Sequence, residues 1–483
     1  MVAPRTLLAM ALGLTGSGCL GPRHQTPEAL RRTPLVQAFT RCKDSVVKFT
    51  ATRVEHSEKP APDGKGTTRV HTTHTQWGSG CIIHPAGYVL TNSHMLQFQG
   101  RRVALLYGGR TCGVELVADD PQNDLAVMKL DADRPLKPIA LGDSNRALIG
   151  EPVFTIGNPF GISFTVTAGI ISGLERSTNT EYASLSNMIQ TDASINPGTS
   201  GGPLLNLAGE MIGLCTSNKK EAENIGFAIS ISKVRAVFAD LIAAEGRYGF
   251  VLGLEVAHEG AARITKVAAG SPAEAAGLCV GDVVTAIGDA AIASNVDFHL
   301  ALVGRKGGES LPLTLRRNGR RLRVTVTLRE VPARPADRLD GLVPGIVWRQ
   351  YAGSWKTLPD FGKLTAAAEG TMPVLGLGGF AGKENFALEL TGYMHAPADG
   401  VYAFYLRSDD GSRLYLGDQL LVDHDGLHAS SEKRGFVRLA AGRHPIRVQF
   451  FQGTGDAELK VSYEGPGIRR QEIPATALSR PGP

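Results

Sequence analysis

Three short stretches of the sequence carry the side chains with which proteins hydrolyse amides through a serine. Ser200 lies in the glycine-rich run GTSGG, His94 ends the run TNSH, and Asp124 directly precedes an apolar run. A serine hydroxyl becomes a nucleophile when an imidazole accepts its proton and a carboxylate orients that imidazole. The three stretches therefore predict attack on a carbonyl carbon by Ser200.

The glycines around Ser200 decide whether this loop is an oxyanion site or a plain turn. The N–H groups of Gly198 and Ser200, with Thr199 between them, would have to point together at the developing negative oxygen, which requires unusual backbone angles. A G-x-S-G-G run alone is equally compatible with a plain turn. His94 and Asp124 upstream, in matching order, favour the oxyanion site.

Short strands must position these groups. From about residue 46 to 231, apolar and polar residues alternate between turns rich in Gly, Pro, Asn and Asp, a pattern typical of antiparallel barrels. A polar stretch at 55–76 interrupts this alternation. Over 232–244 the apolar residues fall on one helical face, so we expect a helix there that closes the domain.

Two further strand-rich units follow. With 483 residues the chain is too long for a single core. In the second unit the pair Asn318-Gly319 predicts a type I′ hairpin, and the third unit is predicted to be a β-sandwich. We expect a signal peptide at 1–19, a tether at 20–33, a first domain at 34–246, a second at 247–331, a linker at 332–341 and a third domain at 342–483.

The N-terminus and the charge balance indicate an exported protein with no nucleic-acid partner. Arg5 precedes an apolar run that is too short to span a bilayer and is typical of a signal peptide. Small residues precede Cys19 as in a bacterial lipobox, although Gly16 stands where Leu is usual, so a lipid anchor through Cys19 and an ordinary cleaved signal both stay open. The formal charge of +5 is far below that of nucleic-acid-binding proteins.

The other cysteines do not form a metal-binding pattern. They are widely spaced, without a C-x-x-C pair, and leave one disulfide of unknown pairing open: Cys42, Cys81, Cys112, Cys215 and Cys279. Cys81 and Cys215 lie in apolar runs, where we expect small buried hydrophobes.

The blocks around the three reactive residues resemble those of the HtrA (DegP/DegQ/DegS) family of envelope serine proteases. The resemblance covers about residues 35–330, and its blocks follow the family order: GSGCIIHPAGYVLTNSHM (78–95), NDLAVMKL (123–130), IGNPFG (156–161), TAGIISG (167–173), QTDASINPGTSGGPLLN (190–206), GEMIGL (209–214) and IGFAIS (225–230). It implies a mainly β fold, with a chymotrypsin-like double β-barrel that carries His94 as general base and Asp124 as orienting acid on the first barrel and Ser200 on the second. It implies no cofactor for catalysis.

The same resemblance implies a substrate class and a specificity pocket. Ile195, five residues before the nucleophile, would line an apolar pocket for small aliphatic side chains, whereas Asn218 falls where the pocket wall is usually apolar. Thr199 replaces the usual Asn and Met95 the usual Val, and neither change removes a reacting group. The implied substrates are unfolded or damaged envelope proteins, and the implied assembly is a homotrimer built through the segment near 35–39.

The second domain resembles the PDZ domain of this family, on the blocks GSPA (270–273), AGL (276–278) and GD (281–282). The loop Val251-Leu252-Gly253-Leu254 would then bind the C-terminal carboxylate of an extended peptide. A small β-domain that only packs on the protease is the alternative.

The third domain resembles the protective-antigen-like (PA) β-sandwich, on residues 385–428 and 440–452. By that resemblance Asp409 and Asp410 would hold calcium that binds carbohydrate, with Asp423 and Asp425 assisting. The run Ser-Asp-Asp-Gly-Ser is also what a plain β-turn looks like.

Two rival functions remain beside an active protease. One is a scaffold or chaperone with a latent triad, and the other is a glycan-binding adhesin.

Overall fold

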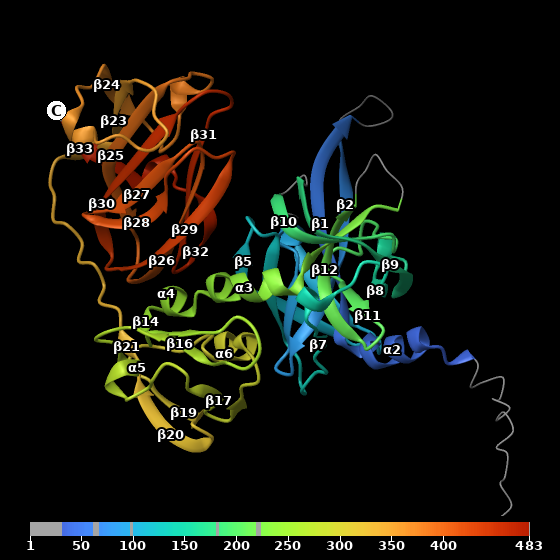
Figure 1. Cartoon of the computed structure of the whole chain (residues 1–483). Helices are drawn as coiled ribbons and strands as arrows, with labels where there is room; N and C mark the ends of the chain where they lie inside the picture. The colour runs from blue at the N-terminus through green and yellow to red at the C-terminus, as the bar shows by residue number, and fades with distance from the viewer. Residues whose placement is uncertain (1–30, 61–66, 97–99, 180–182, 219–223, 483) are drawn as a thin grey trace, which may run out of the picture.

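The computed structural model describes residues 31–60, 67–96, 100–179, 183–218 and 224–482. It consists mostly of strands, arranged as two barrels, a smaller α/β unit and a sandwich of two sheets (Figure 1). The predicted mainly β fold is confirmed. Cys19, the predicted signal peptide and most of the predicted tether lie outside the described residues.

The first barrel follows a short helix, α2 (Pro34–Cys42), which Thr33 caps by accepting from the N–H of Val36. Its six strands close in the order β1-β2-β3-β6-β5-β4. The bounds are β1 (Val46–Pro60), β2 (Thr67–His84), β3 (Tyr88–Thr91), β4 (Arg101–Leu106), β5 (Thr111–Asp120) and β6 (Leu125–Leu130).

The polar stretch 55–76 is not an interruption of the barrel. Its described backbone extends β1 and β2 as one hairpin, in register from Val46 opposite Cys81 to Pro60 opposite Thr67. The ladder joins main-chain groups, so a strand does not need apolar side chains where it leaves the core. Side-chain alternation therefore underestimated the length of these two strands.

The second barrel closes through a pairing of β11 with β12. Its sheet order is β11-β8-β9-β10-β13-β12-β7, with β7 (Ala140–Leu141), β8 (Pro152–Gly157), β9 (Thr165–Asn179), β10 (Ser184–Thr191), β11 (Pro203–Asn206), β12 (Glu210–Asn218) and β13 (Gly226–Ser230). Loops at one side of the two barrels bring the predicted reactive residues together.

Two helices connect the barrels to the second domain. Helix α3 (Ile231–Ile242) begins at the N-cap Ser230 and ends at Ala243, whose φ of 45° is left-handed and breaks the predicted helix two residues before its expected end. Helix α4 (Ala244–Tyr248) follows at once. In Figure 1, α3 runs out from the barrels and α4 lies between the second and third domains.

The second domain is a small α/β unit. The predicted hairpin is confirmed: Arg317 pairs with Arg320, and Asn318 and Gly319 have φ of 49° and 78°. The elements are β14 (Phe250–Val251), β15 (Leu254–Val256), β16 (Ile264–Val267), α5 (Pro272–Ala275), β17 (Val283–Ile287), β18 (Ala290–Ala291), α6 (Asn295–Ala301), β19 (Ser310–Arg317), β20 (Arg320–Thr327) and β21 (Arg329–Glu330).

The third domain is a β-sandwich, as predicted. One sheet contains β22 (Leu342–Pro344), β23 (Ile346–Ala352), β24 (Ala368–Met372), β25 (Phe386–Ala396), β27 (Ser412–Leu416), β28 (Gln419–His424), β30 (Gly442–Gln452) and β33 (Leu478–Pro481). The other contains β26 (Gly400–Asp409), β29 (Ser431–Leu439), β31 (Glu458–Gly465) and β32 (Ile468–Glu472). Apolar side chains of both sheets fill the space between them.

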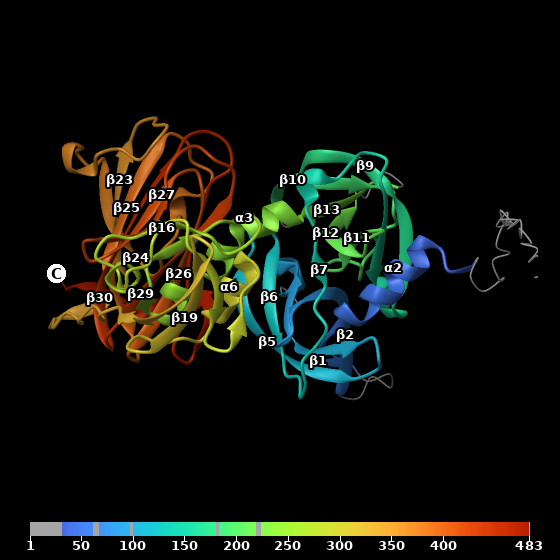
Figure 2. The same ribbon diagram turned by 60° about the horizontal axis from the view of Figure 1, so that its bottom comes forward.

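The sandwich packs against the junction of the other two domains (Figures 1 and 2). Arg434 of β29 donates to the carbonyl oxygens of Asp119, Asp240 and Leu241, and Arg247 of α4 pairs with Glu464 at 3.8 Å. The predicted linker 332–341 is itself held on the sandwich. None of the helices in the described ranges is long and apolar enough to cross a bilayer.

Candidate active site

His94 and Asp124 form a buried pair at the rim of the first barrel. His94 lies in the 3₁₀ turn η2 (Ser93–Leu96) directly after β3, and Asp124 lies in the turn before β6 with a left-handed φ of 51°. The His94 Nδ1 lies 2.9 and 3.0 Å from the two carboxylate oxygens, and the His94 N–H donates to Oδ1 at 3.0 Å. The carboxylate therefore fixes the imidazole with Nδ1 protonated, which leaves Nε2 as the basic nitrogen.

Ser200 joins this pair through Thr216, a residue that sequence reasoning missed. The Ser200 hydroxyl donates to the Thr216 carbonyl oxygen at 2.8 Å, and the Thr216 hydroxyl donates to Asp124 Oδ2 at 2.5 Å. Thr216 is buried in β12. One residue thus contacts both the orienting acid and the serine, and its only sequence signal is a hydroxyl inside an apolar strand.

The loop before Ser200 contains two N–H groups that are not used in its own backbone hydrogen bonds. The Thr199 N–H donates to Asn196 O at 2.8 Å, so Thr199 does not supply the third oxyanion donor that was predicted. The N–H groups of Gly198 and Ser200 have no acceptor among the described residues. Gly198 and Ser200 are two of the three residues that the sequence predicts for the oxyanion site.

Glycine is required in this loop for steric reasons. Gly198 has φ of 100°, and a Cβ there would lie 2.2 Å from the carbonyl oxygen of Asn158. At Gly201, φ is 81° and a Cβ would lie 2.1 Å from the carbonyl oxygen of Ser79. Ser79 also donates through its hydroxyl to Gly198 O at 2.7 Å and through its N–H to Ser200 O at 2.9 Å. Strand β2 of the first barrel thus fixes the loop of the second.

A second acid, Asp119, lies behind the site, and sequence reasoning missed it. It accepts a hydrogen bond from Ser93, the residue before His94, and its Oδ2 lies 3.7 Å from Arg470 of the sandwich. Burial raises the pKa of Asp119 to about 6, and the contacts with Ser93 and Arg470 only partly counter that effect. Asp119 therefore links the sandwich to the segment that carries His94.

Of the predicted specificity residues, only Ile195 can be placed. It is buried, and a Cβ on Gly226 would lie 2.8 Å from its Cδ1, so Ile195 packs directly over the start of β13. The side chain of Asn218 lies outside the described residues.

The cysteines of the described residues are all free. Cys81 and Cys215 are fully buried, as predicted, and burial raises both thiol pKa values. A raised pKa disfavours the reactive thiolate. Both act as small apolar side chains of the barrel cores.

The predicted peptide-binding loop, Val251 to Leu254, runs from the end of β14 to the start of β15. The N–H of Gly253 donates to Oε1 of Glu245 in α4 at 3.0 Å, and the N–H of Leu252 also favours the ionised form of this carboxylate. Glu245 was not predicted from the sequence.

The predicted calcium ligands do not form one cluster. Asp410 accepts from the N–H groups of His428 at 3.2 Å and Gly453 at 2.9 Å. Burial and the neighbouring Asp410 raise the pKa of Asp409. No group of three or more His, Cys, Asp or Glu side chains within the described ranges is placed to hold a metal.

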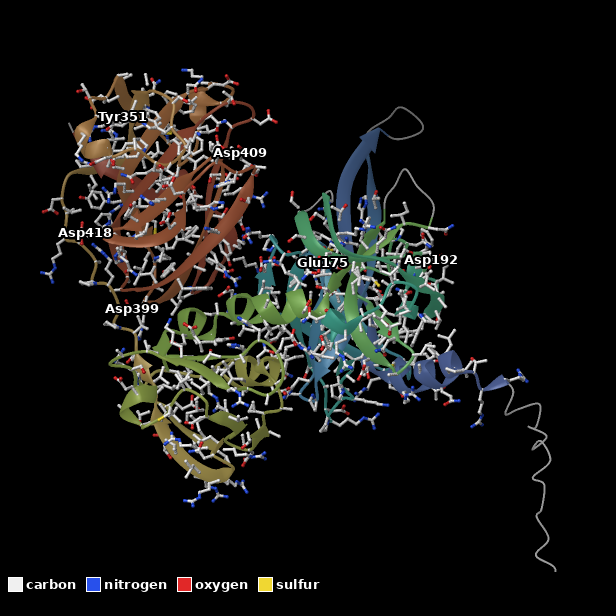
Figure 3. The ribbon with its side chains drawn as sticks, in the orientation of Figure 1. Glu175, Asp192, Tyr351, Asp399, Asp409 and Asp418 are labelled. Atoms are coloured by element: carbon white, nitrogen blue, oxygen red, sulfur yellow. The ribbon has the colours of Figure 1, made fainter. Side chains whose placement is uncertain are left out.

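Asp423 and Asp425 do not assist that pair, because both bind Arg413, at 3.0 and 3.3 Å. Asp409 lies at the end of the sandwich far from the second domain, whereas Asp399 lies at the end beside it (Figure 3).

Three family models match successive parts of the chain: the trypsin-like peptidase domain over residues 78–214, the PDZ domain over 250–328 and the PA14 domain over 380–477. The serine endoprotease DegS of Haemophilus influenzae is 34% identical over 264 residues, which are 53% of this chain and 77% of DegS. The periplasmic pH-dependent serine endoprotease DegQ of Escherichia coli is 35% identical over 269 residues, 52% of this chain and 59% of DegQ.

A solved serine endoprotease from Yersinia pestis is 31% identical and covers 62% of this chain and 99% of its own, with a TM-score of 0.35. The chain spans little more than half the length of several curated relatives, 56% and 59% in two of them. Given the identity and coverage shared with DegS, the chain belongs to the HtrA-type family of serine proteases, and it carries a PDZ domain and a PA14 domain after its protease domain.

Proposed function

We propose that the protein is a serine endopeptidase that hydrolyses peptide bonds of unfolded or damaged proteins. The observation that carries this proposal is the buried Asp124–His94 pair, joined through Thr216 to a serine beside two unpaired N–H donors. This is the set of groups that acyl transfer to a serine requires.

The proposed reaction begins when Ser200 gives its proton to His94 Nε2 and its Oγ attacks the scissile carbonyl carbon. The hydroxyl must first leave the Thr216 carbonyl, to which it donates in this structure. Asp124 stabilises the imidazolium through Nδ1–H, and the N–H groups of Gly198 and Ser200 stabilise the oxyanion. His94 then protonates the leaving amine, and a water molecule, activated by the same imidazole, hydrolyses the acyl-enzyme. Ile195 would floor the pocket for a small aliphatic side chain.

We also propose partners and a location from the same relationship. Relatives are named as periplasmic proteases, which supports export to the periplasm or envelope, with a lipid anchor through Cys19 as the finer proposal. The PDZ domain would bind peptide C-termini. Val36 of α2 is 43% exposed, which supports contact between protomers of a homotrimer near residues 35–39.

The test is digestion of unfolded casein by the wild type, by Ser200→Ala and by Ser184→Ala, a matched change at an exposed serine of β10. We expect cleavage by the wild type and by Ser184→Ala, and a loss of at least about a thousandfold in Ser200→Ala. Cleavage that survives Ser200→Ala would refute the nucleophile. If the wild type stays inactive with C-terminal peptides present, the scaffold hypothesis replaces the protease.

For the C-terminal domain we propose a protective-antigen-like sandwich that binds carbohydrate with calcium at Asp409 and Asp410. Burial and the neighbouring Asp410 raise the pKa of Asp409, so the Asp409 carboxylate would gain from a divalent cation, and hard oxygen ligands suit calcium. Because Asp410 already accepts two N–H bonds, backbone, water and sugar oxygens would have to complete the site. Glycan arrays with and without chelator, on the wild type and on Asp409→Asn, test this. Glycan binding that is reduced neither by the chelator nor by Asp409→Asn would refute the calcium site.

A further inference from the structure

The carboxylate-binding loop of the PDZ domain already holds a carboxylate. The N–H of Gly253 donates to Oε1 of Glu245 at 3.0 Å, and the N–H of Leu252 also favours the ionised form of this carboxylate. Glu245 lies in α4, seven residues before Leu252 and eight before Gly253. The end of a peptide would use the same two donors. Two carboxylates cannot occupy these two N–H groups together.

The loop is built so that its N–H groups face Glu245. The carbonyl oxygen of Leu252 accepts from the N–H of Ala273 at 3.1 Å, and that of Gly253 accepts from the N–H of Ala268 at 3.0 Å. Gly253 has a left-handed φ of 80°, and a Cβ there would lie 2.3 Å from the side chain of Ser271. With the carbonyls fixed on one side, the N–H groups form a preorganised anion nest on the other.

The strand after the nest is ready to accept a peptide. Within the described PDZ domain β15 pairs with β16 alone, so no strand occupies its second edge. A peptide added at this edge would run along β15 with its terminal carboxylate at Leu252 and Gly253. No strand of the described domain pairs with this edge of β15, although Glu245 already binds the N–H groups of the nest.

We propose that Glu245 is an internal competitor that occupies the PDZ carboxylate nest, and that a peptide with a free C-terminus binds by displacing it. The inference rests on the proposed peptide binding by this domain. It assigns to Glu245 a regulatory role.

Burial of the Glu245 carboxylate opposes its hydrogen bonding to the nest, so a peptide carboxylate can replace it. Two N–H donors favour the ionised carboxylate, but burial outweighs them and raises the pKa of Glu245. A carboxylate that is partly desolvated gains when it returns to water. A peptide carboxylate can therefore take over the donors without leaving a buried charge unpaired.

Displacement would release the helix on which the three domains meet. Arg247, two residues after Glu245, pairs with Glu464 of the sandwich and lies 5.3 Å from the ring of Phe436. On the other side, α6 of the PDZ domain contacts α3, where the Asn295 amide donates to Arg235 O at 3.0 Å. Figure 1 shows α4 between the PDZ domain and the sandwich. Peptide binding thus acts on the junction of the whole molecule.

The experiment measures peptide affinity with and without the internal carboxylate. Four fluorescein-labelled decapeptides ending in Val, Leu, Ile or Phe, each as the free acid and as the C-terminal amide, are titrated by fluorescence anisotropy. The proteins are the full chain in the Ser200→Ala form, alone and with Glu245→Gln or Glu245→Ala. Glu309→Gln, the same change at a glutamate of the PDZ domain that lies outside the nest and outside β15 and pairs with Arg305, is the matched control.

We expect the free acids to bind about tenfold or more tightly to both Glu245 variants, because charge-assisted hydrogen bonds no longer compete. The amides should bind weakly to every protein, and Glu309→Gln should match its parent. In the parent, hydrogen exchange at residues 244–248 should rise when a free acid binds, a readout that needs no change at Glu245.

The outcomes separate the two hypotheses. Equal affinity of the free acids for the parent and both Glu245 variants, without faster exchange at 244–248, would overturn the competitor role while leaving peptide binding intact. Weaker binding by the variants would also overturn it, because Glu245 would then support the site. If no free acid binds to any of the proteins, peptide binding by this domain fails and the competitor role with it.

Discussion

Thr216 contacts two members of the candidate triad with two different groups. Its hydroxyl binds Asp124 and its carbonyl binds Ser200, so Thr216→Val removes the first contact and keeps the second. A hydrogen bond to a charged group contributes about 1.5–3 kcal/mol. We expect kcat to fall about 10- to 100-fold with little change in KM, measured on a fluorogenic peptide. Thr285→Val, which removes a hydroxyl that binds Thr314 O in the PDZ domain, should leave both constants unchanged.

Asp119 should make stability depend on pH. Its pKa is raised from 3.8 to about 6, chiefly by burial, so the folded chain binds this proton more tightly than the unfolded chain. Protonation of Asp119 therefore stabilises the folded chain. This contribution to the free energy of unfolding is fully present below about pH 4 and is lost as the pH rises through about 6. Asp119→Asn removes it. From pH 8 to 4.5 the wild type should gain thermal stability relative to Asp119→Asn, by at most about 3 kcal/mol.

The comparison of these two proteins cancels the other carboxylates, which titrate in both. Asp133→Asn, the same change at a carboxylate that is 78% exposed and pairs with Arg110, provides the matched control. A difference between Asp119→Asn and the wild type that does not change with pH would show that the Asp119 carboxylate is not desolvated in the folded chain.

At the scale of elements, the end of α3 is set by one strained residue. Ala243 adopts the left-handed conformation, with its N–H bonded to Ala239 O, a position that favours glycine because a Cβ is costly there. Ala243→Gly should therefore stabilise the protein by about 1 kcal/mol. Ala236→Gly, at an exposed site in the middle of the same helix, should destabilise it by about 1 kcal/mol. Thermal unfolding of the two variants should shift in opposite directions.

The sequence predicted the features of the fold and site that short local motifs determine. His94, Asp124 and Ser200 each lie in a short diagnostic run, and Asn318-Gly319 fixes its own hairpin. Thr216 lies 92 residues from Asp124 and reaches it only because the two barrels pack together. Glu245 lies just beyond the helix predicted over 232–244, and only the fold places it against the PDZ loop. A threonine or glutamate at such a position carries no local signal of its distant partner.

At the scale of the whole molecule, the sandwich is held by a buried guanidinium. Arg434 of β29 donates to the carbonyls of Asp240 and Leu241 at the C-terminal end of α3, and to that of Asp119 behind the site. Burial lowers the pKa of Arg434, and its charge is favoured where helix carbonyls are unpaired. The C-terminal domain thus holds both the protease and its link to the PDZ domain.

Arg434→Met should release the sandwich while preserving its fold, because Met keeps an apolar stem of similar length and loses only the donors. Each lost hydrogen bond to a charged group is worth about 1.5–3 kcal/mol, enough to shift the equilibrium toward an open arrangement by more than tenfold. Trypsin should then cleave the segment 332–341 at least about ten times faster, and small-angle scattering should show a larger radius of gyration. Arg349→Met lies on the opposite sheet, paired with Glu369, and should change neither. Unchanged cleavage in Arg434→Met would mean that apolar contacts such as Phe436 against Gly246 hold the sandwich without this side chain.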